Sequence, residues 1–241
     1  RCGSRGGTRA NATSHATKAT VARAATKSWS LGPSRNCVCS CAPLAVSIYL
    51  PGEVSASLPI TFHGTAKQTN YVSPAGDHTG AADMPVAATK QSWYFLTGVD
   101  VLAPRTTGGI VTLGDSLTDA NVSTADTNSR WPDHLFRRAA AQAGGPRLAI
   151  MNAGIGGNRV LSEGAFNAGV NALARFEVDA LSSPGVTHIV VLEGINDIGQ
   201  ARQNPTPTAE DLIAGHKQLI ERAHAKGLRI FGATLTPFYG A

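Results

Sequence analysis

Long apolar runs are missing from this chain of 241 residues. No stretch reaches the roughly 18 to 20 consecutive apolar residues of a membrane-spanning helix, and no compact apolar segment of a signal peptide is visible near the N-terminus. Hydrophobic residues nevertheless make up 42% of the chain and charged residues 15%. We therefore expect one substantial core with a smaller module, and no membrane partner. Because the first residue is Arg1, export is not excluded.

Acidic residues are absent from residues 1–41. This stretch instead holds seven basic residues: Arg1, Arg5, Arg9, Lys18, Arg23, Lys27 and Arg35. After residue 41 the chain has 14 basic and 16 acidic residues, so the remainder is close to neutral. Nucleic-acid binding needs a basic face on the folded part of a protein, and the sequence does not indicate one.

Cysteine is absent after residue 41, and all four cysteines (Cys2, Cys37, Cys39 and Cys41) lie in the opening stretch. The last three could hold a soft metal, but zinc sites pair their ligands at wider spacing with a second pair elsewhere. Free or adventitiously paired thiols are favoured, and we expect no metal. Residues 1–41 show no helical or strand period, which predicts a disordered tail or a segment from a shifted reading frame.

Alternating hydrophobicity begins at Leu44, where Leu44, Val46, Ile48 and Leu50 share one face before the turn Pro51-Gly52. Further strands are predicted at 58–63, 69–72 and 93–102. Gly, Pro and Asp-rich turns separate them. The pattern predicts a β-rich segment over residues 42–104 that forms part of a β-sandwich.

Strands and helices alternate after Pro104. Strands are predicted at 109–113, 147–151, 187–192 and 229–234, and helices at 131–143, 170–181 and 208–226. Thr208 is expected to cap the last helix together with Asp211. Its apolar stripe is predicted to comprise Leu212, Ile213, His216, Leu219, Ile220 and Ala223. Residues 105–241 therefore predict an α/β fold with three layers, a doubly wound parallel sheet that binds ligands at the carboxyl ends of its strands.

Three polar motifs follow successive strands of this predicted sheet. The first contains Gly114, Asp115 and Ser116. Gly114 permits a tight turn, and the amide that follows it can face a developing oxyanion, so the position of Ser116 suits a nucleophile. A turn or a helix cap is the alternative for an isolated Asp-Ser pair.

The second motif is Asn152-Ala153-Gly154-Ile155-Gly156-Gly157-Asn158, whose glycines let the backbone approach a ligand closely. A dinucleotide-binding loop would lie at the first βα turn with a different glycine spacing, and no P-loop Lys-Ser or Lys-Thr follows. No cofactor is therefore expected.

The third motif is Glu193-Gly194-Ile195-Asn196-Asp197. The amide of Asn196 can donate a hydrogen bond to a charge that appears only in a transition state. A turn-forming Asn-Asp pair is the alternative. Three such sites on the same edge of successive strands favour catalysis.

These segments resemble the first three blocks of the GDSL or SGNH serine hydrolase family, over residues 109–241. The resemblance assigns the nucleophile and one oxyanion donor to Ser116, and the other two donors to Gly157 and Asn196. The residues that support the motifs are Gly114, Asp115, Asn152, Gly194 and Asp197. The resemblance also implies a flavodoxin-like domain without metal or cofactor.

The segments 130–133, 156–159 and 192–199 resemble the branch of aryl- and acylesterases similar to xylan-degradation esterases. A β-rich segment precedes the hydrolase domain in that branch, which fits residues 42–103. The resemblance implies short-chain or acetyl esters as substrates, including esters on carbohydrate, and a secreted or periplasmic protein.

The family's Asp-x-x-His block does not occur in this sequence. Residues 234–241 are predicted to be a fourth strand and the loop beyond it, so we expect the hydrolase domain to be incomplete at its C-terminus. Glu221 and His224 imitate the spacing within a helix, where a solvated pair is expected. His134 and His188 are expected to be surface or packed histidines, and no general base is assigned.

The sequence thus predicts a serine esterase whose 241 residues are weak or inactive without a base. The alternative is a non-catalytic carbohydrate-binding or interaction protein, in which residues 42–103 bind sugar and the hydrolase half is vestigial. The presence of all three motifs argues against this alternative. The sequence gives no indication of the oligomeric state.

Overall fold

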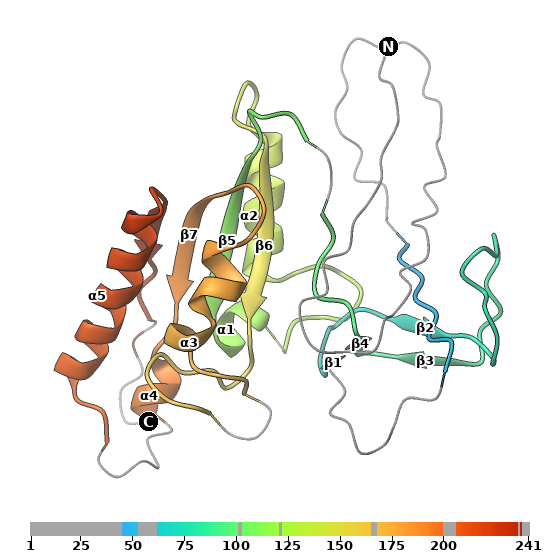
Figure 1. The fold of residues 1–241 in the computed structure, drawn as a ribbon, viewed down its shortest axis with the longest axis horizontal. Coiled ribbons are helices and arrows are strands. Elements are labelled where there is room, and N and C mark those ends of the chain that lie inside the picture. Colours follow the sequence, from blue (N-terminus) through green and yellow to red (C-terminus); the bar gives the residue numbers. More distant parts are fainter. Residues whose placement is uncertain are drawn as a thin grey trace. The chain divides into compact units, whose positions relative to one another are not determined.

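The computed structural model describes residues 45–52, 62–100, 103–120, 122–164, 168–199, 206–235 and 237. The chain divides into two compact units, residues 1–102 and residues 103–241 (Figure 1). The predictions for residues 1–41, including those on the cysteines, lie outside the described residues. No helix of the described part is long and apolar enough to cross a membrane.

The described residues of the first unit form two short antiparallel sheets. Strand β1 (Phe62–His63) pairs with β4 (Trp93–Tyr94), and β2 (Asn70–Val72) pairs with β3 (Ala88–Lys90). The strand predicted at 69–72 is confirmed, whereas β3 was not predicted. The strand predicted at 93–102 is present at Trp93–Tyr94 but wrong over residues 95–100, which are irregular, and residues 101–102 lie outside the described residues. The β-sandwich stays a prediction.

The strand predicted from the alternation between residues 44 and 50 is also wrong. Residues 45–50 form no strand, and Ser47 and Tyr49 are half-buried like Val46, Ile48 and Leu50. A strand requires a hydrogen-bonded neighbour, and residues 45–50 have no ladder partner among the described residues. Alternating hydrophobicity alone could not supply one.

The second unit is built on a parallel sheet whose four described strands match the four predicted ones. They are β5 (Gly108–Gly114), β6 (Leu148–Gly154), β7 (Val186–Leu192) and β8 (Arg229–Gly232), in the order β6-β5-β7-β8. This order is that of a flavodoxin-like sheet. Strand β5 lies in the interior of the sheet, and Val111 and Leu113 are fully buried, as its continuous apolar run predicts.

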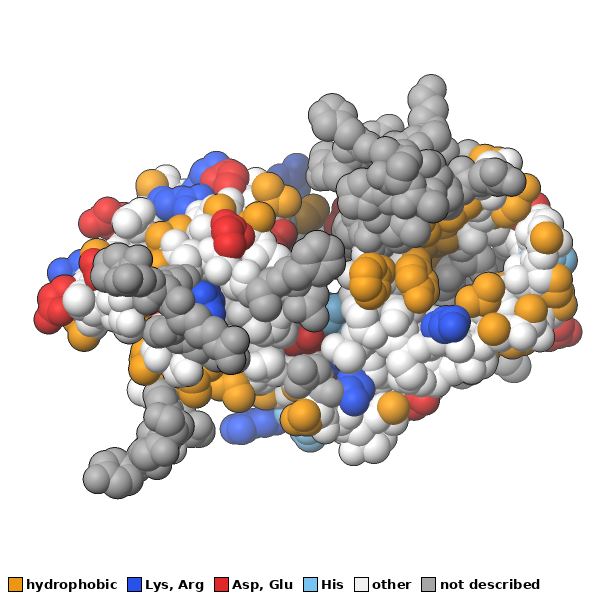
Figure 2. Space-filling model, turned by 90° about the horizontal axis from the view of Figure 1, so that it is seen from below, with side chains coloured by type: hydrophobic (Ala, Val, Ile, Leu, Met, Phe, Trp, Pro, Cys, Tyr) orange, Lys and Arg blue, Asp and Glu red, His pale blue; other side chains and the backbone are white. Residues whose placement is uncertain are grey.

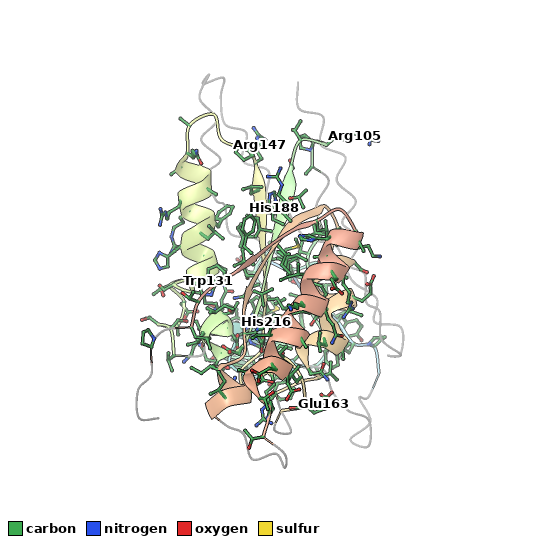
Figure 3. The ribbon with its side chains drawn as sticks, turned by 90° about the vertical axis from the view of Figure 1, so that its left-hand side faces the viewer. Arg105, Trp131, Arg147, Glu163, His188 and His216 are labelled. Carbon is green, nitrogen blue, oxygen red and sulfur yellow. The ribbon has the colours of Figure 1, made fainter. Side chains whose placement is uncertain are left out.

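Helices cover both faces of this sheet. Helix α2 (Trp131–Ala141) lies on one side and α5 (Ala209–Ala225) on the other (Figure 3). Helix α3 (Ala172–Phe176) continues into a π-helical turn at Glu177–Leu181, together matching the helix predicted at 170–181. The main buried cluster, which joins the sheet to α3, the π-helical turn and α5, contains Val111, Leu113, Phe176, Ile189 and Leu219. The three-layer α/β prediction is therefore confirmed.

Helix α5 has the predicted cap, and part of its predicted apolar stripe is buried. The backbone N–H of Asp211 donates to Thr208 Oγ1 at 3.1 Å, and the Thr208 N–H donates to the Asp211 carboxylate at 2.9 Å. Ile213 and Ile220, however, are 52% and 41% exposed. Leu219 and Ala223 are buried as predicted, and Gly215, which was not predicted, is buried beside them. Val160 and Leu161 occupy the space beside Gly215, where a Cβ would stand only 2.6 Å from Leu161 Cδ2.

Candidate active site

The three motifs lie at the carboxyl edge of the parallel sheet. Gly114 at the end of β5 is in register with Gly154 at the end of β6 and with Leu192 at the end of β7. The N–H of Ile155 donates to the carbonyl of Gly114 at 2.9 Å, which joins the first motif to the second. The expectation that the motifs share one edge agrees with this arrangement.

Ser116 is the first residue of the short helix α1 (Ser116–Asp119), directly beyond the interior strand β5. Asp115 caps this helix, because its buried carboxylate accepts the Leu117 N–H at 2.8 Å. Ser116 itself is half-buried. Gly114 is required before it, since a Cβ there would stand 2.6 Å from the carbonyl oxygen of Leu192 and would also collide with the Thr118 side chain. The turn therefore fixes the backbone of the serine.

The glycine motif packs directly against this turn. Asn152 donates from Nδ2 to the carbonyl of Thr118 at 3.0 Å, and its Oδ1 accepts the N–H of Gly154 at 2.8 Å. A Cβ on Gly154 would collide with the backbone of Thr118 and Asp119. Gly157 has φ of +79°, a backbone conformation that favours glycine.

The third motif is held to the glycine motif by side-chain hydrogen bonds. Asn196 Nδ2 donates to the carbonyl of Asn158 at 2.9 Å. The carboxylate of Asp197 accepts the N–H groups of Val160 at 2.8 Å and Leu161 at 3.1 Å. Asn196 and Asp197 belong to helix α4 (Ile195–Gly199), which follows Gly194 with its φ of +119°. Asp197 therefore holds the two motifs together.

Arg175 of α3 is a residue that the sequence did not single out. Its side chain runs to the ends of β5 and β6, donating to the carbonyl oxygens of Gly114 at 3.0 Å and Ala153 at 2.7 Å. Arg175 Nε also donates to Asn158 Oδ1 at 2.9 Å. No sequence motif predicts such a buried residue, because a single arginine in an amphipathic helix is usually solvated.

Buried carboxyl groups surround this arginine. Glu193 Oε2 lies 3.6 Å from Arg175 Nη2, and Glu193 is only 4% exposed. Neither carboxyl oxygen of Glu193 has a hydrogen-bond partner among the described residues. Burial raises the pKa of Glu193 to about 8, because the loss of hydration outweighs the attraction of Arg175. Burial also raises the pKa of Asp115.

The described histidines of this unit occupy different environments. His134 on α2 is exposed, and Arg137 Nη2 lies 3.1 Å from its Nδ1. His188 on β7 stacks on Phe231, and Glu221 and His224 on α5 are both exposed, as expected for a solvated pair. His216 on α5 is half-buried beside Gly194, and burial lowers its pKa (Figure 3).

Within the described part of the chain, no group of three or more His, Cys, Asp or Glu side chains is arranged to hold a metal ion. On the face that Figure 2 shows, Lys and Arg side chains of the second unit lie interspersed with Asp and Glu side chains. That face presents both signs of charge rather than a basic surface.

Three solved structures illustrate the similarity to known proteins. AlinE4, an SGNH-hydrolase family esterase, is 20% identical with a TM-score of 0.43, over 56% of this chain and 62% of its own. A carbohydrate acetylesterase from Sinorhizobium meliloti is 15% identical with a TM-score of 0.44, over 54% and 65% of the two chains. The psychrotrophic esterase EstA from Pseudoalteromonas sp. is 21% identical with a TM-score of 0.41, over 55% and 63%. The chain thus spans less than two thirds of each.

No curated protein matches the chain. The model of the GDSL-like Lipase/Acylhydrolase family, in contrast, matches residues 112–241. This match covers more than half of the sequence and all three motifs. The chain therefore belongs to the GDSL-like lipase/acylhydrolase family.

Proposed function

We propose that this protein hydrolyses carboxylic acyl esters through an acyl-enzyme on Ser116. The observation that carries the proposal is the hydrogen-bonded linkage of the three motifs at one sheet edge. Ile155 N–H binds the carbonyl of Gly114 at 2.9 Å, and Asn196 Nδ2 binds the carbonyl of Asn158 at 2.9 Å. A hydroxyl, main-chain amides and a carboxamide are thereby supported by one rigid framework.

In this mechanism Ser116 Oγ attacks the ester carbonyl, and its proton passes to a general base. The carbonyl oxygen becomes an oxyanion, which accepts hydrogen bonds from the N–H groups of Ser116 and Gly157 and from Asn196 Nδ2. The tetrahedral intermediate collapses, the proton moves to the leaving alcohol, and Ser116 carries the acyl group. Water then attacks the acyl-enzyme with help from the same base and releases the acid.

The general base is the unassigned part of this mechanism. The family supplies it from Asp-x-x-His, which does not occur in these 241 residues. A serine hydroxyl is hardly ionised at neutral pH and needs a neighbour that takes its proton. The 241 residues alone are therefore expected to hydrolyse esters slowly, with an acceleration over water of about 10³ to 10⁴ from oxyanion binding.

Acetyl and other short acyl esters, including those on carbohydrates, are the substrate class that we propose. This choice rests on the resemblance of the segments 130–133, 156–159 and 192–199 to aryl- and acylesterases. Such substrates need only a small acyl pocket next to the oxyanion site. p-Nitrophenyl acetate and an acetylated oligosaccharide are suitable probes.

The test compares the 241-residue chain with the longest protein that its gene encodes, each with Ser116 and with Ser116→Ala. In the active form, Ser116→Ala is expected to lower kcat for p-nitrophenyl acetate at least about 10³-fold. Ser129→Ala is the matched control, because Ser129 is exposed and lies outside the three motifs. Full activity in Ser116→Ala would show that the nucleophile is misassigned. Absence of hydrolysis in both forms would favour the carbohydrate-binding alternative.

A further inference from the structure

Arg175 makes an unusual set of contacts for a side chain that is only 4% exposed. Its guanidinium donates four hydrogen bonds: to Gly114 O at 3.0 Å, Ala153 O at 2.7 Å, Asn158 Oδ1 at 2.9 Å and Asp179 Oδ2 at 3.1 Å. A guanidinium has five N–H donors in a rigid planar fork, so these bonds use nearly all of them. The side chain is held in a single orientation.

The partners of this fork belong to all three parts of the candidate site. The carbonyl of Gly114 belongs to the peptide that leads into Asp115 and Ser116, and the carbonyl of Ala153 lies at the start of the glycine motif. Glu193, whose carboxyl oxygen is 3.6 Å from Arg175 Nη2, begins the third motif. One buried cation therefore contacts the ends of β5 and β6 and the residue after β7.

A second set of contacts extends this arrangement to Asn196. Asn158 is fully buried, and its side chain accepts from Arg175 and donates to the carbonyls of Ala168 at 2.7 Å and Val170 at 2.8 Å. The carbonyl of the same residue accepts from Asn196 Nδ2. Arg175 thus fixes Asn158, and Asn158 orients the carboxamide of Asn196.

We propose that Arg175 is a positioning residue for ester hydrolysis, whose guanidinium fixes the serine turn and, through Asn158, the carboxamide of Asn196. This inference rests on the proposed function, because it assigns Asn196 to the oxyanion site. Arg175 contacts no substrate in this arrangement. It acts on the transition state through the geometry of the donors.

The expected loss of kcat in an Arg175 variant follows from the contribution of the oxyanion donors that Arg175 positions. Loss of one oxyanion donor costs about 10²- to 10³-fold in kcat, and a displacement of about 1 Å in a supporting group can cost about 10²-fold. Lysine keeps the positive charge but has a single nitrogen, which cannot span Gly114, Ala153 and Asn158 together. Arg175→Lys therefore removes the forked set of hydrogen bonds while it keeps the positive charge.

The experiment measures kcat and KM for p-nitrophenyl acetate in the longest protein that the gene encodes. Arg175→Lys is expected to lower kcat about 10²-fold with KM within about threefold, because substrate binding does not use the fork. Arg222→Lys is the matched control, expected to leave both constants within about threefold. Arg222 donates to the carbonyl of Leu173 at 2.6 Å and lies over the Phe176 ring, so both contacts are with α3 rather than with the strand ends.

A readout that is independent of activity follows the side-chain amide protons of Asn196 by NMR in the 241-residue chain. Their exchange with solvent is expected to be at least about tenfold faster in Arg175→Lys and unchanged in Arg222→Lys. A folded Arg175→Lys protein with unchanged kcat, or with unchanged exchange at Asn196, would overturn the inference. If Arg175→Lys does not fold, Asn158→Ser is measured instead, and a kcat within threefold of the parent overturns it.

The parent protein and Ser116→Ala are assayed alongside, so that the two proposals can fail separately. An inactive parent or an active Ser116→Ala protein would refute the proposed function. The amide exchange of Asn196 would still show whether Arg175 fixes the carboxamide of Asn196. An active parent, an inactive Ser116→Ala and a fully active Arg175→Lys would refute the positioning role alone.

Discussion

Glu193 is a carboxyl group whose protonation depends on folding. It faces Arg175 and is also influenced by the charges of Asp115 and Asp197, which raise its pKa further. Its pKa rises from an ordinary 4.5 to about 8 in the folded protein. Between these two values the folded state holds a proton that the unfolded state releases. The resulting stabilisation is fully present below pH 4.5 and is lost as the pH rises through 8.

Glu193→Gln is therefore expected to flatten the loss of stability toward alkaline pH. Between pH 5 and pH 9, the free energy of unfolding of Glu193→Gln should fall by at least about 1 kcal/mol less than that of the parent. Urea unfolding at both values measures the difference. Glu177→Gln is the control, since hydrogen bonds from Lys226 and Ser182 lower the pKa of Glu177. Equal slopes for the parent and Glu193→Gln would contradict the prediction.

At the level of single residues, the sequence predicted the motif positions but not the buried support beneath them. Ser116, Gly157 and Asn196 follow apolar strand runs, so their place at a sheet edge could be inferred, and their catalytic roles stay predictions. Arg175 and its pairing with Glu193 could not be inferred, because burial of an arginine depends on which helix face meets the sheet. That choice is made by tertiary packing.

Among the elements, α5 shows how a local signal and a longer pattern differ in reliability. Its capping box joins Thr208 to Asp211 within one turn, so the signal involves neighbouring residues only. The prediction of the apolar stripe depended on which side of the helix packs against the sheet. Gly215 lets Val160 and Leu161 come close, and this contact turns Ile213 and Ile220 toward solvent.

The cap of α5 provides a test at this scale. Thr208→Ala removes the Oγ1 acceptor of the Asp211 N–H and is expected to lower the free energy of unfolding by about 1 kcal/mol. Thr124→Ala, an exposed threonine outside any helix, is expected to change it by less than about 0.5 kcal/mol. Denaturant unfolding of both variants measures the difference. Equal stabilities would mean that the cap contributes nothing to folding.

The β-rich unit marks the limit of prediction for whole elements. Strands in the parallel sheet were predictable, because burial on both faces gives continuous apolar runs that do not depend on register. The segment at residues 45–50 carried an equally clear alternation yet forms no strand. Pairing between distant segments decides whether such a segment becomes a strand, and a short alternating run contains no information about its partner.

At the scale of the whole molecule, we expect the backbone amides of the described strands to differ in how readily they exchange with solvent. Strand β5 is hydrogen-bonded to β6 and β7, whereas β8 pairs only with β7 among the described strands. Amide protons of β5 are expected to exchange only through global unfolding, and those of β8 at least about tenfold faster. The two-stranded sheet of β1 and β4 should exchange faster still. Hydrogen-exchange mass spectrometry would contradict this order if β5 and β8 exchanged at the same rate.

The glycines at the strand ends limit how this protein can be changed by laboratory evolution. At Gly114 and Gly154 even a methyl group would strike backbone atoms, which cannot swing aside as a side chain can. Mutational libraries aimed at these positions will return mostly misfolded clones. Variation that is meant to change the proposed ester preference has to be introduced in the loops beyond the strand ends, where added bulk leaves the turn before Ser116 intact.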